Sequence, residues 1–219
     1  MKRFFQFSIL LVLLSSGHAF SQNLTVGASG TPLRELKRRD ELGSAYFNTQ
    51  FLASDVVSAG GKRFSLAALR YNLLNQQVEY LDDDVVYQVQ DSLLSFRVID
   101  NLGKSHLMEK KVMDNKPLFL ETIAKGKVAL FKRYTAKSTN TEDWYTKKKV
   151  TTIVPEVAYY VSNGDNLERF SANRKNVLTL FSDKGEQIKT FLNKNGTDFK
   201  NDDSLKDLFS YYNSLSGNP

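Results

Sequence analysis

Short runs of alternating apolar and polar residues fill most of this chain, and they constrain its fold more than any other feature. Such alternation over four to eight residues is typical of a half-buried β-strand. Tight turns rich in Gly, Asn and Asp separate the runs, which leaves no room for the helical crossovers that parallel strands need. The sequence therefore predicts an antiparallel sheet of about ten short strands. The runs are residues 54–57, 63–70, 77–81, 85–90, 94–99, 105–112, 119–124, 127–134, 149–154, 157–161 and 167–170.

Two prolines and one polar segment interrupt this alternation. Pro117 and Pro155 lack the backbone N–H that a central strand uses for pairing, so we interpret each as a break between strands. Residues 135–142 are mostly Ser, Thr, Lys and Asn. We expect them to form a mobile inserted loop.

The pattern changes near Asn173, where apolar residues begin to recur at the three- and four-residue spacing of amphipathic helices. Two or three short helices are predicted. Their apolar faces contain Val177, Leu178, Leu180 and Phe181, then Ile188, Phe191 and Leu192, then Leu205, Leu208, Phe209, Tyr212 and Leu215. Helices this short are unstable alone, so we expect them to pack on the sheet as a C-terminal cap. The predicted fold class is α+β, mainly antiparallel sheet followed by helices.

The ends of these helices also have sequence signals. Asp183 with Glu186, and Ser204 with Asp207, fit N-cap arrangements for the second and third helices. Asn195-Gly196 fits the end of the second helix, because glycine readily adopts the left-handed conformation there.

The first 21 residues have the order of a cleavable secretory signal. Met1-Lys2-Arg3 is basic, residues 4–14 are almost entirely apolar, and the small residues Ala19 and Ser21 lie two apart. Cleavage is expected between Ser21 and Gln22. The apolar run is shorter than the roughly 20 residues that span a bilayer, so no membrane-spanning segment is expected after cleavage. The predicted organisation is a signal peptide at 1–21, a flexible lead-in at 22–43, an antiparallel β domain at 44–171 and a helical cap at 172–219.

Composition restricts which modifications and which classes of partner the exported chain can have. The sequence has no cysteine, so disulfides and lipid attachment to a cysteine are both excluded. The net charge of +6 falls to +4 when Lys2 and Arg3 leave with the signal. Basic and acidic residues are mostly interleaved, which argues against a nucleic-acid surface. The exceptions are residues 34–39 and Lys147-Lys148-Lys149, which we interpret as solvated surface.

Groups that carry catalysis are scarce. His106 is the one histidine left after cleavage, so a Ser/His pair and a zinc site of His and Cys are not expected. His106 lies in a predicted strand, and we interpret it as an ordinary sheet residue. The acidic clusters at 82–84, 142–143 and 202–203 lie in or beside turns, where Asp is favoured for backbone reasons. No catalytic residue, cofactor or metal ligand is predicted, although two distant carboxylates would suffice for a glycosidase-like hydrolase.

Tyrosines are the candidates for a recognition surface. Tyr71, Tyr159 and Tyr160 lie in predicted strands, where neighbouring residues face opposite sides of the sheet. One of Tyr159 and Tyr160 should therefore be buried and the other exposed. Exposed aromatic side chains can mark a binding site, whereas packing in the core is the alternative for all three.

Two stretches resemble secreted, functionally uncharacterised proteins of Bacteroidota. The first is Leu69-Arg70-Tyr71-Asn72-Leu73, with the return through Val78-Glu79-Tyr80. The second is the C-terminal passage from Leu180-Phe181-Ser182-Asp183-Lys184 to Tyr211-Tyr212-Asn213. The resemblance implies an exported protein with an antiparallel β domain and a helical C-terminus. It implies no activity.

Three functions remain open at this point. The first is a non-enzymatic binding or interaction module of the bacterial cell envelope, secreted or periplasmic, in which a sheet edge or aromatic face meets an envelope protein. The second is a carrier that encloses a hydrophobic ligand, such as a lipid, in a curved sheet. The third is a carboxylate-dependent hydrolase with two acids in a cleft. The absence of a catalytic constellation favours the binding module.

Overall fold

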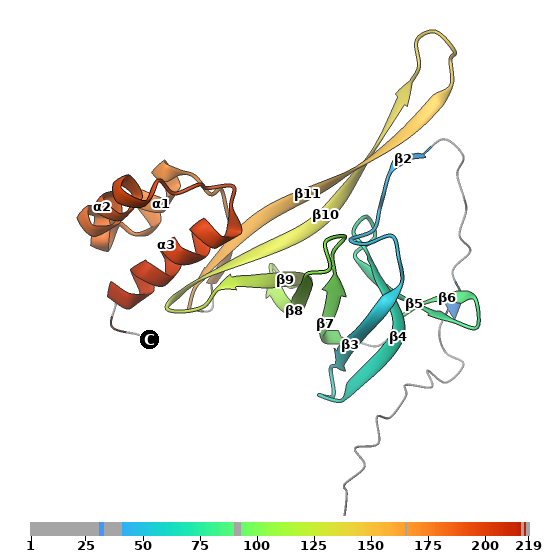
Figure 1. Ribbon diagram of the computed structural model, residues 1–219, viewed down its shortest axis with the longest axis horizontal. Coiled ribbons are helices and arrows are strands. Elements are labelled where there is room, and N and C mark those ends of the chain that lie inside the picture. The colour runs from blue at the N-terminus through green and yellow to red at the C-terminus, as the bar shows by residue number, and fades with distance from the viewer. Residues whose placement is uncertain (1–30, 33–40, 90–92, 165, 216, 218–219) are drawn as a thin grey trace, which may run out of the picture.

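The computed structural model describes residues 31–32, 41–89, 93–164, 166–215 and 217. The predicted cleavage residues Ser21 and Gln22 lie outside this part of the chain, as does most of the predicted lead-in. The described residues form a sheet followed by short helices (Figure 1). The predicted α+β class, with a mainly antiparallel sheet, is confirmed.

The described residues form twelve strands, which make up one sheet. The strands are β1 (Thr31–Pro32), β2 (Glu41–Gly43), β3 (Leu52–Ser58), β4 (Arg63–Asn72), β5 (Gln77–Asp82), β6 (Val85–Gln88), β7 (Leu93–Ile99), β8 (Ser105–Met113), β9 (Lys116–Ala124), β10 (Val128–Glu142), β11 (Lys149–Asn163) and β12 (Asn166–Phe170). Their order across the sheet is β1-β6-β5-β4-β3-β7-β8-β9-β10-β11-β12. β2 pairs with β11 in parallel, outside this path. The other pairs are antiparallel.

Tight turns explain why neighbours in the sheet are mostly neighbours in the chain. Asp83 and Asp84 join β5 to β6 with φ angles of 45° and 62°, and Asp114 and Asn115 join β8 to β9 with 50° and 59°. Two successive positive φ angles are typical of the type I′ turn, whose twist matches that of the flanking strands. Asp and Asn tolerate this left-handed region better than most residues. The turn predicted at 82–84 is therefore confirmed, and backbone geometry accounts for its acidic residues.

The β10–β11 hairpin is the longest element of the sheet. Each strand has 15 residues, and their register runs from Val128 opposite Asn163 to Glu142 opposite Lys149. Its far end projects well beyond the rest of the sheet (Figure 1). Two predictions were wrong here, because residues 135–142 continue β10 instead of forming a loop, and Pro155 lies inside one continuous β11.

Register explains why a proline is tolerated in β11. Its partner Ala136 donates its N–H away from β11, to the carbonyl oxygen of Leu73 at 3.1 Å. Ala136 and Pro155 therefore form a pair without mutual hydrogen bonds, and the missing N–H of Pro155 falls on the outer edge of β11. Among the described strands, β2 covers that edge at 151–153 and β12 at 159–163. Pro117 is likewise the second residue of β9, outside the part of that strand that pairs with β10, so it does not break the sheet.

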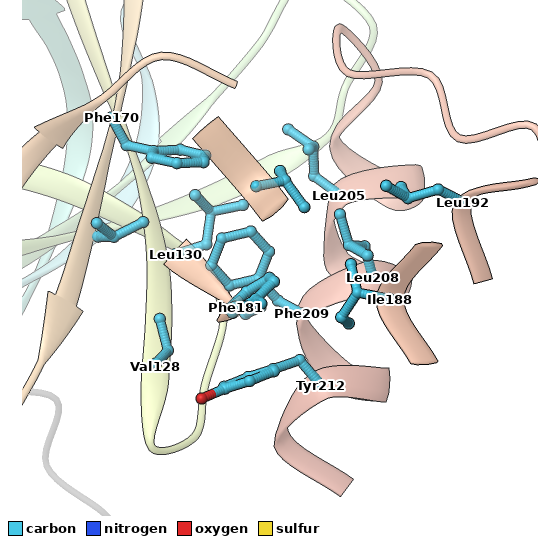
Figure 2. Close-up of a cluster of buried hydrophobic side chains, with 13 residues drawn as sticks. Val128, Leu130, Phe170, Phe181, Ile188, Leu192, Leu205, Leu208, Phe209 and Tyr212 are labelled. Atoms are coloured by element: carbon cyan, nitrogen blue, oxygen red, sulfur yellow. The ribbon is translucent and has the colours of Figure 1, made fainter. Parts of the chain in front are cut away.

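Buried apolar side chains form three clusters. One contains Tyr71 and Phe96 and lies among β3, β4, β5, β7 and β8. A second joins Leu130 of β10 to Phe209 and other residues of the helices (Figure 2). The third contains Phe131. Because successive residues of a strand face opposite sides of the sheet, Leu130 and Phe131 enter different clusters.

The helical segment comprises α1 (Arg174–Leu180), the 3-10 turn η1 (Ser182–Lys184), α2 (Gly185–Asn195) and α3 (Asp202–Leu215). Gly196 has a φ of 57° at the end of α2, which confirms the predicted glycine stop. The two predicted N-caps were wrong. No side chain caps α2, which follows η1 directly, and the side chain of Asn201 accepts the hydrogen bond from the Ser204 N–H at the start of α3. Within the described ranges, no helix has the length and apolar character that crossing a membrane requires.

α3 is attached to the sheet at both ends. Near its C-terminus, Asn213 accepts a hydrogen bond from Val128 N at 3.1 Å and donates to the carbonyl oxygens of Val128 and Lys125. Gly126 permits this contact, because a Cβ there would lie 2.3 Å from the Asn213 side chain. At the N-terminus of α3, Asp202 accepts hydrogen bonds from Lys132 Nζ and from the hydroxyl of Tyr159, each at 2.7 Å.

Candidate functional site

The three candidate tyrosines do not form one exposed surface. Tyr71 and Tyr160 are buried, at 1% and 4% exposure, and belong to two different apolar clusters. Burial raises the pKa of Tyr71 despite the nearby Arg133. Tyr159 is partly buried and its hydroxyl donates to Asp202. Packing is therefore the observed role of Tyr71 and Tyr160, and Tyr159 attaches a helix to the sheet.

A network of ionisable side chains surrounds His106. Its Nδ1 lies 2.9 Å from an oxygen of Glu121, and its Nε2 lies 3.1 Å from an oxygen of Asp100. The other oxygen of Glu121 accepts the hydroxyl of Tyr134 at 2.6 Å. The ring of Phe47 packs edge-on against both His106 and Tyr134. The turn after β7, the strands β8 and β9, and β10 thus meet in one polar cluster.

Two carboxylates make the charged form of His106 favourable. Burial disfavours the imidazolium, but hydrogen bonds and charges from Glu121 and Asp100 outweigh it and raise the pKa of His106 above its ordinary value of 6.5. Burial would raise the pKa of both carboxyls, but the contacts with His106 lower it. The Tyr134 hydroxyl lowers the pKa of Glu121 further. The N–H groups of Lys104 and Leu102 do the same for Asp100. The cluster therefore favours the protonated form of His106 between two carboxylates.

The contacts of this cluster tie the turn after β7 to strands β8 and β9. A general base needs a ring nitrogen within reach of a substrate, whereas both nitrogens of His106 are engaged with carboxylates. A surface groove of about 520 Å³ runs past Asp100 and is open, and its other lining residues are Asn48, Thr49, Gln50, Leu52, Ile99, Asn101 and Gly103. The described residues contain no group of three His, Asp or Glu side chains placed to hold a metal ion.

The cavities offer little to an apolar ligand. The cavity beside Tyr71 and Leu69 has a volume of about 10 Å³, which is room for one water molecule. The open groove along Asp55 and Arg97 measures about 380 Å³ and is lined by Ser and charged residues as well as apolar ones. A drug-sized or lipid ligand needs an apolar cavity of several hundred Å³ that buries most of its surface. None of these three cavities has that form.

Exposed aromatic side chains occur instead at the end of the β10–β11 hairpin. Trp144 is 81% exposed and Tyr145 80% exposed. Their rings contact each other edge-on, with centroids 5.7 Å apart. We name residues 142–149 the hairpin tip. No other tryptophan exists in the chain, and its large, mostly apolar side chain is 81% exposed to solvent.

Hydrogen bonds fix the conformation of the hairpin tip. Oδ1 of Asp143 accepts from the N–H of Tyr145 at 3.0 Å, and from the N–H and hydroxyl of Thr146 at 2.6 and 2.8 Å. The bonds from Thr146 lower the pKa of Asp143, so the carboxylate stays charged. Lys147 closes the loop with a φ of 57° and donates its N–H to the Asp143 carbonyl oxygen at 2.9 Å. Trp144 and Tyr145 are therefore presented by an ordered turn.

Cationic side chains flank the aromatic pair. Lys147, Lys148 and Lys149 are all exposed. Lys147 lies 3.9 Å from Glu142, a pair that is open to solvent and therefore weak. The lysines were predicted to be solvated surface, which agrees with their exposure, but no link between them and Trp144 was predicted. The available signal was the position of the sole tryptophan between an acidic pair and a lysine run in a polar segment.

Comparison of the chain with profiles of known protein families, with curated proteins and with solved structures found no match. The candidate site therefore rests on the geometry of this chain alone, and the hairpin tip is the part of the described surface in which exposed aromatic and cationic side chains are combined.

Proposed function

We propose that the protein is an exported, non-enzymatic interaction module of the bacterial cell envelope, and that the hairpin tip is its contact element. The observation that carries this proposal is the exposure of Trp144 and Tyr145 on an ordered turn at the end of a projecting hairpin. Tryptophan and tyrosine dominate the binding energy of many interfaces because they bury large areas with few rotatable bonds. An aromatic pair that is about 80% exposed has most of its surface free for a partner.

Two further features support the contact role. The hydrogen bonds of Asp143 order the turn before any partner arrives, so little conformational entropy is lost on binding. The hairpin also places the tip beyond the rest of the sheet (Figure 1). The alternative functions lack comparable support, because the three cavities described above are small or open and His106 is engaged on both sides.

Replacing both Trp144 and Tyr145 with alanine is expected to weaken binding of the purified protein to a bacterial envelope fraction by more than about tenfold. Because both side chains are exposed, the melting temperature should stay within about 2 °C of the wild type. Co-sedimentation measures binding, and circular dichroism measures melting. The matched control is Leu102→Ala, which removes a side chain that is 93% exposed in the turn between β7 and β8. Equal binding by the double variant and the wild type would refute the proposed contact element.

A further inference from the structure

We infer that the partner of the hairpin tip is an anionic lipid surface. This inference rests on the proposed function, since it names the class of partner that the same residues would contact. The inference goes beyond the proposed function because the aromatic pair, the lysines and the polar hairpin each restrict the class of partner.

The aromatic pair has the chemistry of the membrane interface. Indole and phenol rings combine an apolar body with one polar group, and tryptophan and tyrosine are enriched at the headgroup level of bilayers for that reason. Trp144 and Tyr145 are 81% and 80% exposed, so both rings are available to enter that layer. The two rings contact each other edge-on, so they can enter the layer side by side.

The charge of the hairpin tip favours an anionic surface. Lys147, Lys148 and Lys149 follow the aromatic pair directly and are exposed. The two acids at the tip offset part of this charge, because Asp143 is exposed and accepts from Tyr145 N and Thr146, and Glu142 lies beside Lys147. Three lysines against two carboxylates leave residues 142–149 with a net charge of +1, and the three cations follow one another directly. Near an anionic membrane each lysine adds about fivefold to the binding constant.

The hairpin behind the tip limits the depth of contact. Residues 137–142 of β10 are exposed, and their side chains are all polar or charged. They pair with residues 149–154 of β11. A strand that lies in the hydrocarbon layer needs an apolar face toward lipid, which residues 138–142, Ser-Thr-Asn-Thr-Glu, do not supply. β2 runs beside residues 151–153, so two residues of each strand, about 7 Å, extend beyond it. That is sufficient for the tip to touch headgroups ahead of the rest of the sheet. The geometry fits a surface contact.

Vesicles test this inference directly. The purified protein should co-sediment with vesicles of phosphatidylcholine mixed with the anionic lipid phosphatidylglycerol, and not with vesicles of phosphatidylcholine alone. Because Trp144 is the sole tryptophan, its fluorescence reports on the tip, and its emission should shift to shorter wavelength on the anionic vesicles. The variant Lys147→Gln, Lys148→Gln, Lys149→Gln should partition about 100-fold more weakly.

A charge-matched control separates the tip from the overall charge of the protein. Lys62→Gln, Lys104→Gln, Lys116→Gln removes three exposed lysines elsewhere on the sheet, and its partitioning should fall by less than about threefold at moderate salt. Equal losses in the two triple variants would overturn the assignment to the tip, as would vesicle binding without a Trp144 shift.

The two proposals fail in different ways. If neither kind of vesicle binds while the envelope fraction still binds through Trp144 and Tyr145, the lipid inference is overturned and the partner is a protein or glycan. If phosphatidylcholine vesicles bind as well as the anionic ones, the charge argument is wrong. If binding to the envelope fraction does not depend on Trp144 and Tyr145, the proposed function itself is wrong.

Discussion

Phe209→Ala is expected to lower the free energy of unfolding by about 3–5 kcal/mol, because it opens a cavity where the helices meet the sheet. Phe209 is fully buried in α3. Its ring contacts Phe181 edge-on at 5.0 Å and Phe170 of β12 at 6.1 Å, so one side chain joins the helical segment to a strand (Figure 2). Neighbouring side chains relax only partly into such a space, which adds a cavity term to the lost transfer free energy.

Urea unfolding followed by circular dichroism measures this effect. For a domain of this size the loss corresponds to a fall in melting temperature of about 10 °C. Lys206→Ala is the matched control, because Lys206 is exposed on the same helix and alanine keeps the helix propensity high. A loss below about 1 kcal/mol for Phe209→Ala would mean that α3 does not pack on the sheet as described.

His106→Ala is expected to lower the free energy of unfolding by about 2–4 kcal/mol, because it leaves two carboxylates without their cation. Glu121 would keep the hydroxyl of Tyr134 but lose the imidazolium 2.9 Å away. Asp100 would keep the backbone N–H groups of Leu102 and Lys104. The cost therefore falls mainly on Glu121, which is the more buried of the two carboxylates.

The pH dependence of stability follows from the direction of each pKa shift. The pKa of His106 is raised, so its contribution is complete below its unfolded value of 6.5 and is lost as the pH rises through the folded value. The pKa values of Glu121 and Asp100 are lowered, so their contributions are complete above 4.5 and 3.8 and are lost as the pH falls. The network stabilises the fold most between pH 4.5 and 6.5.

Urea unfolding at several pH values across and above this range measures both the stability lost in His106→Ala and the direction in which stability changes with pH. The wild type should lose stability as the pH rises above 6.5, and His106→Ala should lack that loss because its titrating group is gone. His106→Gln keeps a hydrogen-bond donor without the charge, so it should be intermediate in stability and equally flat above that pH. Parallel pH profiles for all three proteins would show that the network does not hold a protonated histidine.

The sequence predicted the strands well where local chemistry determines them. Alternation and the turn at 82–84 placed most of the sheet, and Gly196 ended α2 where expected. It failed at Pro155, because a single sequence does not show on which edge a missing N–H will fall. Residues 135–142 were taken for a loop since they lack an apolar face, yet pairing with β11 holds them as strand without any burial.

The candidate site was less predictable. Tyr71 and Tyr160 are buried through long-range packing that spacing along the chain does not reveal. His106, Glu121 and Tyr134 are far apart in sequence and meet only because β8, β9 and β10 are neighbours in the sheet. The hairpin tip was visible in outline, as a sole tryptophan beside lysines, but its exposure depends on the length of a hairpin that was not predicted.

The central claim is that the hairpin tip carries the binding function, and shortening the hairpin tests it most directly. Replacing residues 142–149 with Asn-Gly would join Thr141 to Val150, which face each other in the register, through a type I′ turn. The pairing of β2 with Thr151–Ile153 would remain. We predict that the shortened protein melts within about 3 °C of the wild type and no longer co-sediments with the envelope fraction. Undiminished binding by a folded, shortened protein would contradict the claim.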